Sequence, residues 1–342
     1  MPTRRKTVAL AGSAAGLALA ARRVVLLSRR PPTVADHGPP PAGSTTVRAD
    51  DGVALHVEVD GDSAAPLTVV FTHGFTARLG EFALQREALR SHARLVLWDQ
   101  RGHGRSAWGD LTHATIDQTG RDLGAVLDAV APSGRVVLVG HSMGGMSVLA
   151  LARQRPDLFG TRVVGAFLLA TSAGGLVADG PVADMVTRLR RAGALPLLLR
   201  GLQRAAPVLE RTRQRGTKSG YAYTRRYLFG RDDAEPRLVR EVQTLLEETP
   251  WTVTAAFYAT FLSHDEYAAL DVVRRVPTTV VVGTSDRLTP ERHSHLLAER
   301  LAPDCELVVV PGAGHSVNIT RPQLVDAALL RLLERASQRA AA

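Results

Sequence analysis

Residues 136–145 read Val-Val-Leu-Val-Gly-His-Ser-Met-Gly-Gly, an apolar run followed by the pattern Gly-x-Ser-x-Gly centred on Ser142. Four consecutive apolar residues, three of them β-branched, are typical of a strand buried on both faces. A helical pattern begins at Met143, so the chain must turn sharply, and Gly140 and Gly144 lack the side chains that would collide there. A plain glycine-rich turn is the alternative. The flanking strand and helix favour instead an elbow that lifts the Ser142 hydroxyl above the edge of a sheet.

Short apolar stretches recur along the chain and predict a layered α/β fold. The first two expected strands flank the turn 50–52, which is typical of a hairpin, and amphipathic stretches such as 81–90 and 119–130 separate later ones. Alternation of strands and helices predicts a mostly parallel, eight-stranded sheet with helices on both faces. Besides 136–139, the expected strands are 45–48, 55–59, 67–71, 95–98, 163–169, 279–282 and 307–310.

The alternation stops between residues 171 and 264, where the pattern is helical and rich in leucine and arginine. We expect this segment to be a helical cap inserted after the sixth strand, before the sheet resumes. Its arginines are most simply a solvated face, and binding of an anionic lipid or substrate is the alternative. They cluster as Arg188, Arg190 and Arg191, as Arg211, Arg213 and Arg215, and as Arg225 and Arg226.

A serine hydroxyl becomes a useful nucleophile only when a base removes its proton, and that base is usually oriented by a carboxylate. Asp286 follows the expected strand 279–282, and His315 follows the last strand after a glycine-rich approach. Because the carboxyl ends of parallel strands meet at one edge, we expect Ser142, Asp286 and His315 to form a catalytic triad. A surface or helix-capping role is the alternative for Asp286. We expect His56, His92 and His293 to be ordinary surface residues.

A tetrahedral intermediate also needs donors for its negatively charged oxygen. The amide of Met143, beside Ser142, is the natural first donor. The second should come from the loop after an earlier strand, and we assign it to the amide of Phe75, which Gly74 allows to approach closely. His73 is expected to form structural hydrogen bonds rather than to act as an acid or base.

The net charge of +9 over 342 residues first suggests a nucleic-acid binder. Seven basic residues precede the first acidic residue, Asp36, and leave only +2 for residues 31–342, so we expect no nucleic-acid partner. The single cysteine, Cys305, excludes an intrachain disulfide, and we expect it to be buried and inert. We see no metal-binding cluster or phosphate-binding loop and expect no cofactor.

Residues 1–30 combine basic residues with an uncharged stretch over 7–21, which indicates a signal or a short membrane anchor. Fifteen helical residues would span roughly 22 Å, less than the ~30 Å hydrocarbon core, so arginines at both ends would have to reach the interfaces. We therefore expect membrane association or export, with a cytoplasmic tail as the alternative. The prolines of residues 31–44 predict a semi-rigid linker.

These motifs together resemble the α/β-hydrolase-fold serine hydrolases over residues 45–335. The resemblance rests on His73-Gly74-Phe75, Gly140-His141-Ser142-Met143-Gly144-Gly145, the Asp286 loop, Gly314-His315, and the run 99–106, Asp-Gln-Arg-Gly-His-Gly-Arg-Ser. It implies a core formed by residues 45–170 and 265–338 with the cap at 171–264. In the run 99–106 we expect Asp99 and Arg101 to form a local ion pair. Family members with an aspartate nucleophile are disfavoured, because serine occupies the elbow.

The form Gly-His-Ser-Met-Gly-Gly resembles monoacylglycerol lipases and carboxylesterases. This implies hydrolysis of a small-molecule ester with an apolar or lipid-like acyl group through an acyl-enzyme. Acyl transfer, perhydrolysis or cleavage of a carbon–carbon bond on the same triad are alternatives. A non-catalytic binding protein on the same fold is a further alternative, and it would predict a broken triad.

Overall fold

The computed structural model describes residues 43–176, 183–212, 215–231 and 234–339. Their centre is an eight-stranded sheet in the order β1-β2-β4-β3-β5-β6-β7-β8. At one end of the sheet, β2 pairs in antiparallel fashion with both β1 and β4, and all the other neighbouring pairs, from β4-β3 to β7-β8, are parallel. The predicted number of strands and their mostly parallel arrangement are therefore confirmed. The strands are β1 (Ser44–Arg48), β2 (Ala54–Gly61), β3 (Leu67–Thr72), β4 (Arg94–Trp98), β5 (Arg135–His141), β6 (Val163–Leu169), β7 (Thr278–Gly283) and β8 (Cys305–Val310).

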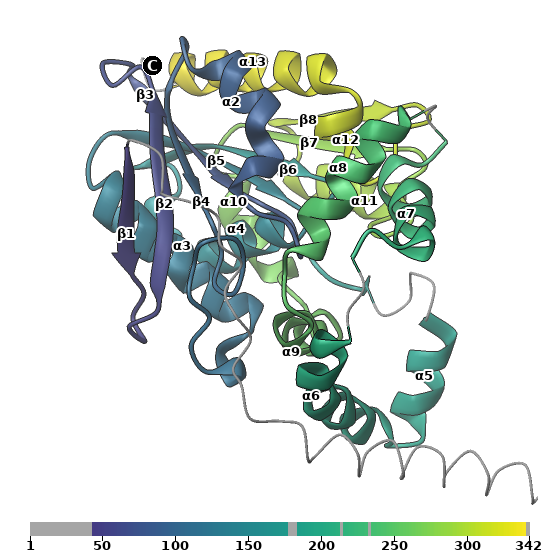
Figure 1. The fold of residues 1–342 in the computed structure, drawn as a ribbon. Helices are drawn as coiled ribbons and strands as arrows, with labels where there is room; N and C mark the ends of the chain where they lie inside the picture. Colours follow the sequence, from purple (N-terminus) through teal and green to yellow (C-terminus); the bar gives the residue numbers. More distant parts are fainter. Residues whose placement is uncertain (1–42, 177–182, 213–214, 232–233, 340–342) are drawn as a thin grey trace, which may run out of the picture.

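Helices cover both faces of this sheet because alternate side chains of each central strand point to opposite sides. In β5, Leu138 packs with helices α3 (Ile116–Val130), α4 (Met143–Gln154), α10 (Leu270–Val273) and α11 (Glu291–Leu301). The next residue, Val139, packs with α2 (Ala83–Leu89) and α13 (Pro322–Arg339) on the other face (Figure 1). The strands are thus apolar on both sides, as the run 136–139 predicts.

A helical insertion lies between β6 and β7, as expected for the segment 171–264. Its helices α6 and α9 pack against each other at one end of the molecule (Figure 1). A single π-helical turn, η5, interrupts the regular pattern. The elements of the cap are α5 (Ala183–Arg191), α6 (Leu195–Arg211), α7 (Lys218–Thr224), η5 (Arg225–Phe229), α8 (Pro236–Glu247) and α9 (Trp251–Phe261).

The expected ion pair between Asp99 and Arg101 is wrong. The Asp99 carboxylate accepts backbone amides instead, those of Leu79 at 2.8 Å and Arg105 at 2.9 Å. The side chain of Arg101 is long, so its fully buried guanidinium reaches two carboxylates from distant segments. Its nitrogens lie 2.6 Å from an oxygen of Asp122 and 2.8 Å from an oxygen of Asp51. The run 99–106 is structural, but its role is to join separate segments.

Two of the three histidines expected at the surface are buried. His56 lies on β2, which is covered because it sits inside the sheet between β1 and β4, and it pairs with Glu58 at 3.3 Å. His293 lies in the first turn of α11, and its Nδ1 is 2.9 Å from the Ser172 hydroxyl. His92 is exposed, as expected. Both histidines are covered by elements that are distant in the sequence, so the residues around them along the chain do not reveal their burial.

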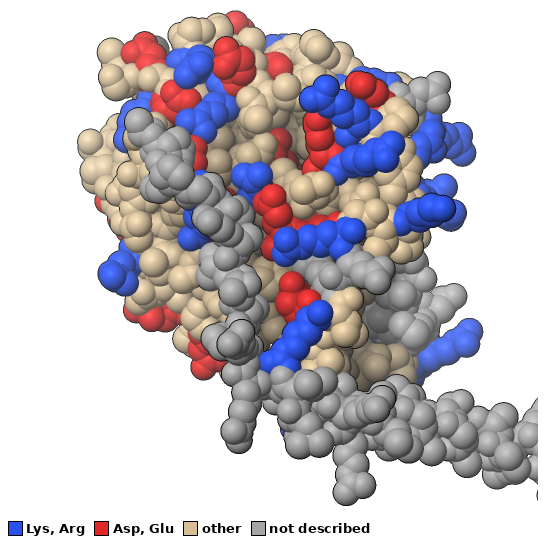
Figure 2. All heavy atoms as spheres, viewed as in Figure 1, with Lys and Arg blue, Asp and Glu red and all other residues tan. Residues whose placement is uncertain are grey.

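The expected segment 1–30 and most of the linker 31–44 lie outside the described residues, and Ser44 already belongs to β1. Across the described ranges, no helix is both long and apolar enough to span a membrane. On the face drawn in Figure 2, basic and acidic side chains are intermingled, in line with the small net charge of this part of the chain. Cys305 is partly rather than fully buried, and burial raises the pKa of its thiol to about 11.

Candidate active site

Ser142 stands at the sharp turn between β5 and α4, with φ of 51° and ψ of −116°. A non-glycine residue rarely adopts a positive φ, and such strain persists only where the surroundings enforce it. Here the Ser142 amide donates to Leu169 O at 2.9 Å, and the Thr171 hydroxyl donates to Ser142 O at 2.7 Å. A Cβ atom on Gly145 would lie only 2.6 Å from Thr171, so α4 can start this close to β6 only with glycine there. The elbow predicted from residues 136–145 is confirmed.

Asp286 and His315 meet at the same edge of the sheet. Nδ1 of His315 lies 2.8 Å from Oδ2 of Asp286, and both side chains are buried. Oδ1 of Asp286 accepts the amides of Leu288 and Thr289 at 2.8 and 3.0 Å, so the carboxylate is held from its own loop. With Nδ1–H donating to the carboxylate, Nε2 is left to accept a proton. Asp286 is therefore a buried partner of His315 and not a surface residue.

Ser142 is brought beside this pair through its neighbour His141. The rings of His141 and His315 lie 4.8 Å apart, and His141 Nε2 donates to the His315 carbonyl oxygen at 3.0 Å. Within the described residues no hydrogen bond joins the Ser142 hydroxyl to His315. Such bonds are often long before substrate binds and tighten in the reacting complex.

Phe75 and Met143 carry backbone amides at the elbow. Met143 is the first residue of α4, so its amide has no partner within the helix. The loop of Gly74 lies against the elbow, since a Cβ atom on Gly74 would be 3.4 Å from Ser142 Cβ. Across the part of the chain that the structure describes, neither amide donates to another protein group. Two such amides beside Ser142 are suited to binding a negatively charged oxygen.

Two buried histidines support the loop that carries Phe75. His73 accepts the Gln100 amide at Nε2 (2.9 Å) and donates from Nδ1 to Gly74 O (2.7 Å). His103 accepts the amide of Thr76, whose φ is 60°, at 3.1 Å. Burial lowers the pKa of both rings, to about 3 for His103, so each stays neutral and accepts at Nε2. The structural role predicted for His73 is confirmed, whereas the role of His103 was missed.

Apolar side chains of the cap cover this edge. Val253 and Phe257 of α9 are buried in one cluster with Met143, and Phe75 and Phe261 pack against it. The rings of Phe75 and Phe261 lie 5.0 Å apart, nearly edge to face. The surroundings of the two amides are therefore mainly hydrocarbon.

The cap also contacts the loop of His315 through its backbone. The amide of His315 donates to Tyr227 O at 3.4 Å, and that of Ser316 donates to Leu228 O at 2.9 Å, both acceptors lying in η5. Just beyond η5, the Arg231 amide donates to Gly312 O at 3.1 Å. The segment from η5 to Arg231 therefore forms one wall of the loop that holds His315.

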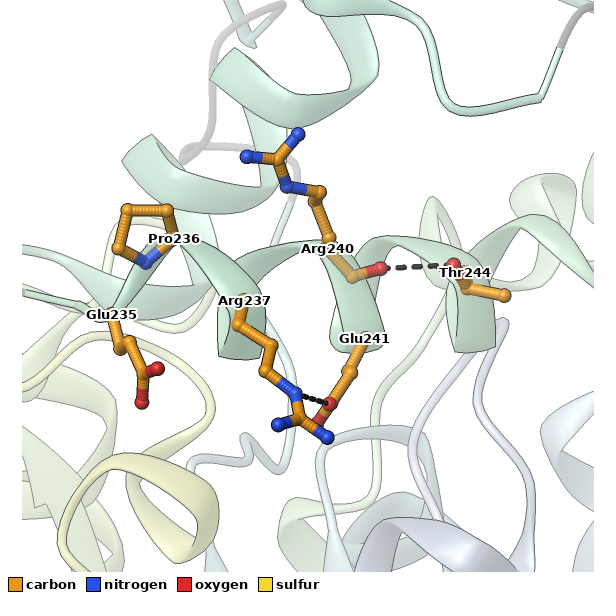
Figure 3. Close-up of a pocket in the computed structure, with 6 residues that line it drawn as sticks. All are labelled: Glu235, Pro236, Arg237, Arg240, Glu241 and Thr244. Carbon is orange, nitrogen blue, oxygen red and sulfur yellow. Dashed lines mark hydrogen bonds and ion pairs between the residues drawn. The ribbon is translucent and has the colours of Figure 1, made fainter.

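A hollow of about 480 Å³ lies along α8 and is lined by Glu235, Pro236, Arg237, Arg240, Glu241 and Thr244 (Figure 3). Four of its lining residues are engaged with one another in pairs. Arg237 pairs with Glu241 at 2.9 Å, and the Thr244 hydroxyl donates to Arg240 O at 2.9 Å. Its lining has two carboxylates, Glu235 and Glu241, but neither a histidine nor a cysteine. Nowhere in the described ranges do three His, Cys, Asp or Glu side chains lie together in a way that could hold a metal ion.

Comparison with known proteins agrees with this fold. A family model described as "Alpha/beta hydrolase family" matches residues 69–328. RutD of Caulobacter sp. (strain K31), whose name proposes carbamate hydrolysis, is 29% identical, covering 82% of this chain and 95% of its own. A hydrolase from Pseudomonas aeruginosa PA01 superposes with a TM-score of 0.66 at 26% identity, covering 86% of this chain and 99% of its own.

Two further solved structures carry more specific titles. Est816, described as an N-acyl homoserine lactone degrading enzyme, has a TM-score of 0.60 at 26% identity, covering 84% of this chain and 99% of its own. A thermophilic esterase from Thermogutta terrifontis has a TM-score of 0.62 at 24% identity, over 86% of this chain and 99% of its own, and shows similarity of fold alone.

Proposed function

The chain belongs to the alpha/beta hydrolase family, and from that membership we propose that it is a serine hydrolase that cleaves carboxylic esters through an acyl-enzyme. One observation carries the proposal: a buried pair of His315 and Asp286, 2.8 Å apart, at the same sheet edge as Ser142 in its strained elbow. A histidine held by a carboxylate beside a partly buried serine hydroxyl is the arrangement that activates a weak nucleophile.

In the first half of the reaction, the Ser142 oxygen attacks the ester carbonyl carbon while Nε2 of His315 takes the hydroxyl proton. The amides of Phe75 and Met143 donate to the resulting oxyanion. His315 then gives its proton to the departing alkoxide, and the acyl group remains on Ser142. In the second half, water attacks the acyl-enzyme, His315 takes the water proton, and it returns that proton to Ser142 as the acid leaves.

The lining of the site supports an apolar acyl or alcohol group. Phe75 and Phe261 lie beside the two proposed oxyanion donors, together with the buried residues Val253 and Phe257. A hydrocarbon chain gains about 25 cal/mol per Å² when it leaves water, so such a wall favours longer chains over acetate.

Turnover of p-nitrophenyl esters from acetate to laurate tests the proposal, together with labelling by a fluorophosphonate probe. We expect labelling at Ser142, and Ser142→Ala should lose both labelling and turnover. The matched control is Ser294→Ala, which removes a buried hydroxyl on α11 outside the site. Undiminished turnover by Ser142→Ala would remove Ser142 from the mechanism. An added alcohol that diverts the acyl group into a new ester would favour acyl transfer over hydrolysis.

We further propose that residues 1–30 attach the protein to a membrane or export it, which rests on the basic and apolar pattern of that segment. Fractionation of a reporter fused to residues 1–44 tests this. A reporter that stays soluble and unprocessed would contradict it and favour the cytoplasmic alternative.

A further inference from the structure

The triad does not use a second buried pair of a histidine and a carboxylate, which lies directly behind it. Nδ1 of His141 is 2.8 Å from Oε1 of Glu81, and the two side chains are 3% and 5% exposed. Glu81 lies in the short helix η1 (Leu79–Phe82), far from His141 in the sequence. Burying two charges is costly unless they are paired and satisfied by further hydrogen bonds, so the contacts of this pair decide its purpose.

Each end of the pair reaches a different part of the proposed machinery. The second carboxylate oxygen of Glu81 accepts the Gly74 amide at 2.9 Å, in the loop that presents Phe75. The other nitrogen of His141, Nε2, lies 3.0 Å from the carbonyl oxygen of His315. His141 itself is the last residue of β5 and precedes Ser142.

Both nitrogens of His141 face acceptors, one a carboxylate and the other a carbonyl. A ring can donate from both only as the imidazolium. Burial opposes both charges, yet the Glu81 carboxylate raises the pKa of His141, and His141 in turn lowers the pKa of Glu81. The pairing favours the imidazolium, which is ion-paired with Glu81 at Nδ1 and donates from Nε2 to the carbonyl oxygen of His315.

We propose that Glu81 and His141 form a positioning pair. The pair fixes the loop that carries Phe75, the turn at Ser142 and the backbone of His315 relative to one another. The inference rests on the proposed function. It concerns geometry only: neither residue touches the reacting atoms. Glu81 also supplies the negative charge that balances the His141 imidazolium. That ring lies 4.8 Å from the ring of His315, where a second positive charge must form during turnover.

Replacement of Glu81 by glutamine tests this, because the amide can serve only one of the two donors as an acceptor. We expect Glu81→Gln to lower kcat roughly tenfold or more while KM changes less than about twofold, because small misplacements of reacting groups are costly. In a double-mutant cycle with His141→Gln, the kcat of the double variant should be no lower than that of the slower single variant, because both substitutions remove the same interaction.

The chain offers a closely matched control. Glu58 and His56 form another buried pair, 3.3 Å apart on β2 and outside the site. Glu58→Gln makes the same chemical change and should leave kcat unchanged. The proposal is overturned if Glu81→Gln keeps kcat within about twofold of wild type, if Glu58→Gln lowers kcat equally, or if the two effects in the cycle multiply.

A measurement without turnover keeps the test independent of folding defects and of the proposed function. In ¹⁵N-histidine NMR of the unsubstituted protein at neutral pH, the signal lost in His141→Gln should show both ring nitrogens protonated. A neutral ring with one proton would overturn the proposal. An unsubstituted protein that neither labels nor turns over esters would refute the proposed function, while this NMR result would still decide the state of the pair.

Discussion

The hydroxyl of Thr289 donates to Oδ2 of Asp286 at 2.8 Å, the same oxygen that accepts Nδ1–H of His315. The Asp286 carboxylate is thus held on both oxygens, and its direction toward His315 is set by a residue three positions along the same loop. Loops with Asp followed by Thr commonly close in this way, because the carboxylate binds amides and hydroxyls just ahead of it.

Thr289→Val should therefore impair the chemical step. The variant keeps the shape but loses a hydrogen bond to a charged group, which is worth about 1.5–3 kcal/mol, so we expect kcat to fall roughly tenfold or more. Steady-state kinetics measure this, with Thr279→Val, a buried threonine of β7, as the control. Equal kcat values for the two variants would show that Thr289 does not orient Asp286.

The strain at Ser142 predicts a stability difference that is independent of activity. Both Ser142→Gly and Ser142→Ala remove the hydroxyl, but only glycine adopts a φ of 51° without penalty. We expect Ser142→Gly to be more stable than Ser142→Ala by about 1 kcal/mol in the free energy of unfolding. Urea denaturation of both variants measures the difference, and an equal or reversed order would contradict a strained elbow.

His103 should make the fold sensitive to acid. Its pKa is about 3 in the folded protein against an ordinary value of 6.5, so below pH 6.5 the unfolded chain binds a proton that the folded chain excludes. Stability contributed by this residue is full above pH 6.5 and falls as the pH drops towards 3, by about 2 kcal/mol at pH 5. Burial also lowers the pKa of His73, His264 and His293, which act in the same direction, whereas the raised pKa of His141 acts in the opposite direction.

The variant His103→Gln isolates this effect, because the glutamine carbonyl can still accept the Thr76 amide. The loss of stability between pH 7 and pH 5, measured by urea denaturation, should be smaller in the variant than in the unsubstituted protein. Parallel curves would mean that His103 is already protonated or accessible in the folded state.

Cys305 should be a poor nucleophile in the folded protein. Burial raises the pKa of its thiol to about 11, so little thiolate exists at pH 8. We expect slow alkylation by iodoacetamide that accelerates on unfolding in urea, and no loss of ester turnover after alkylation is complete. Mass spectrometry follows the modification. Rapid labelling of the folded chain at pH 8 would contradict the shift.

Much of the site was predictable because sequence order and sheet order are linked. Ser142, Asp286 and His315 each follow an apolar strand, and parallel strands bring their carboxyl ends to one edge. The glycine pattern around Ser142 is likewise local, since it answers a steric need of the turn itself. The cap was predictable as a break in the alternation of strands and helices.

The supporting contacts could not be predicted because they depend on distant partners. Arg101 binds Asp122 and Asp51 rather than its neighbour Asp99, and the choice follows from the reach of a long side chain in the folded molecule. Glu81 is an ordinary helical glutamate in the sequence until the fold places it against His141. Thr289 alone carried a local signal, the Asp-x-x-Thr spacing from Asp286.

The backbone bonds between η5 and the loop of His315 bear on how new specificities arise in this architecture. A cap that merely covered the site could be exchanged freely between relatives, and only the substrate preference would change. Here residues 225–231 hold the segment that carries the proposed base, so they belong functionally to the core although they are encoded within the insertion. Chimeras should therefore exchange the helices on either side of residues 225–231 and keep those residues themselves. The side chains of α6, α8 and α9 would then vary while the position of His315 stays the same.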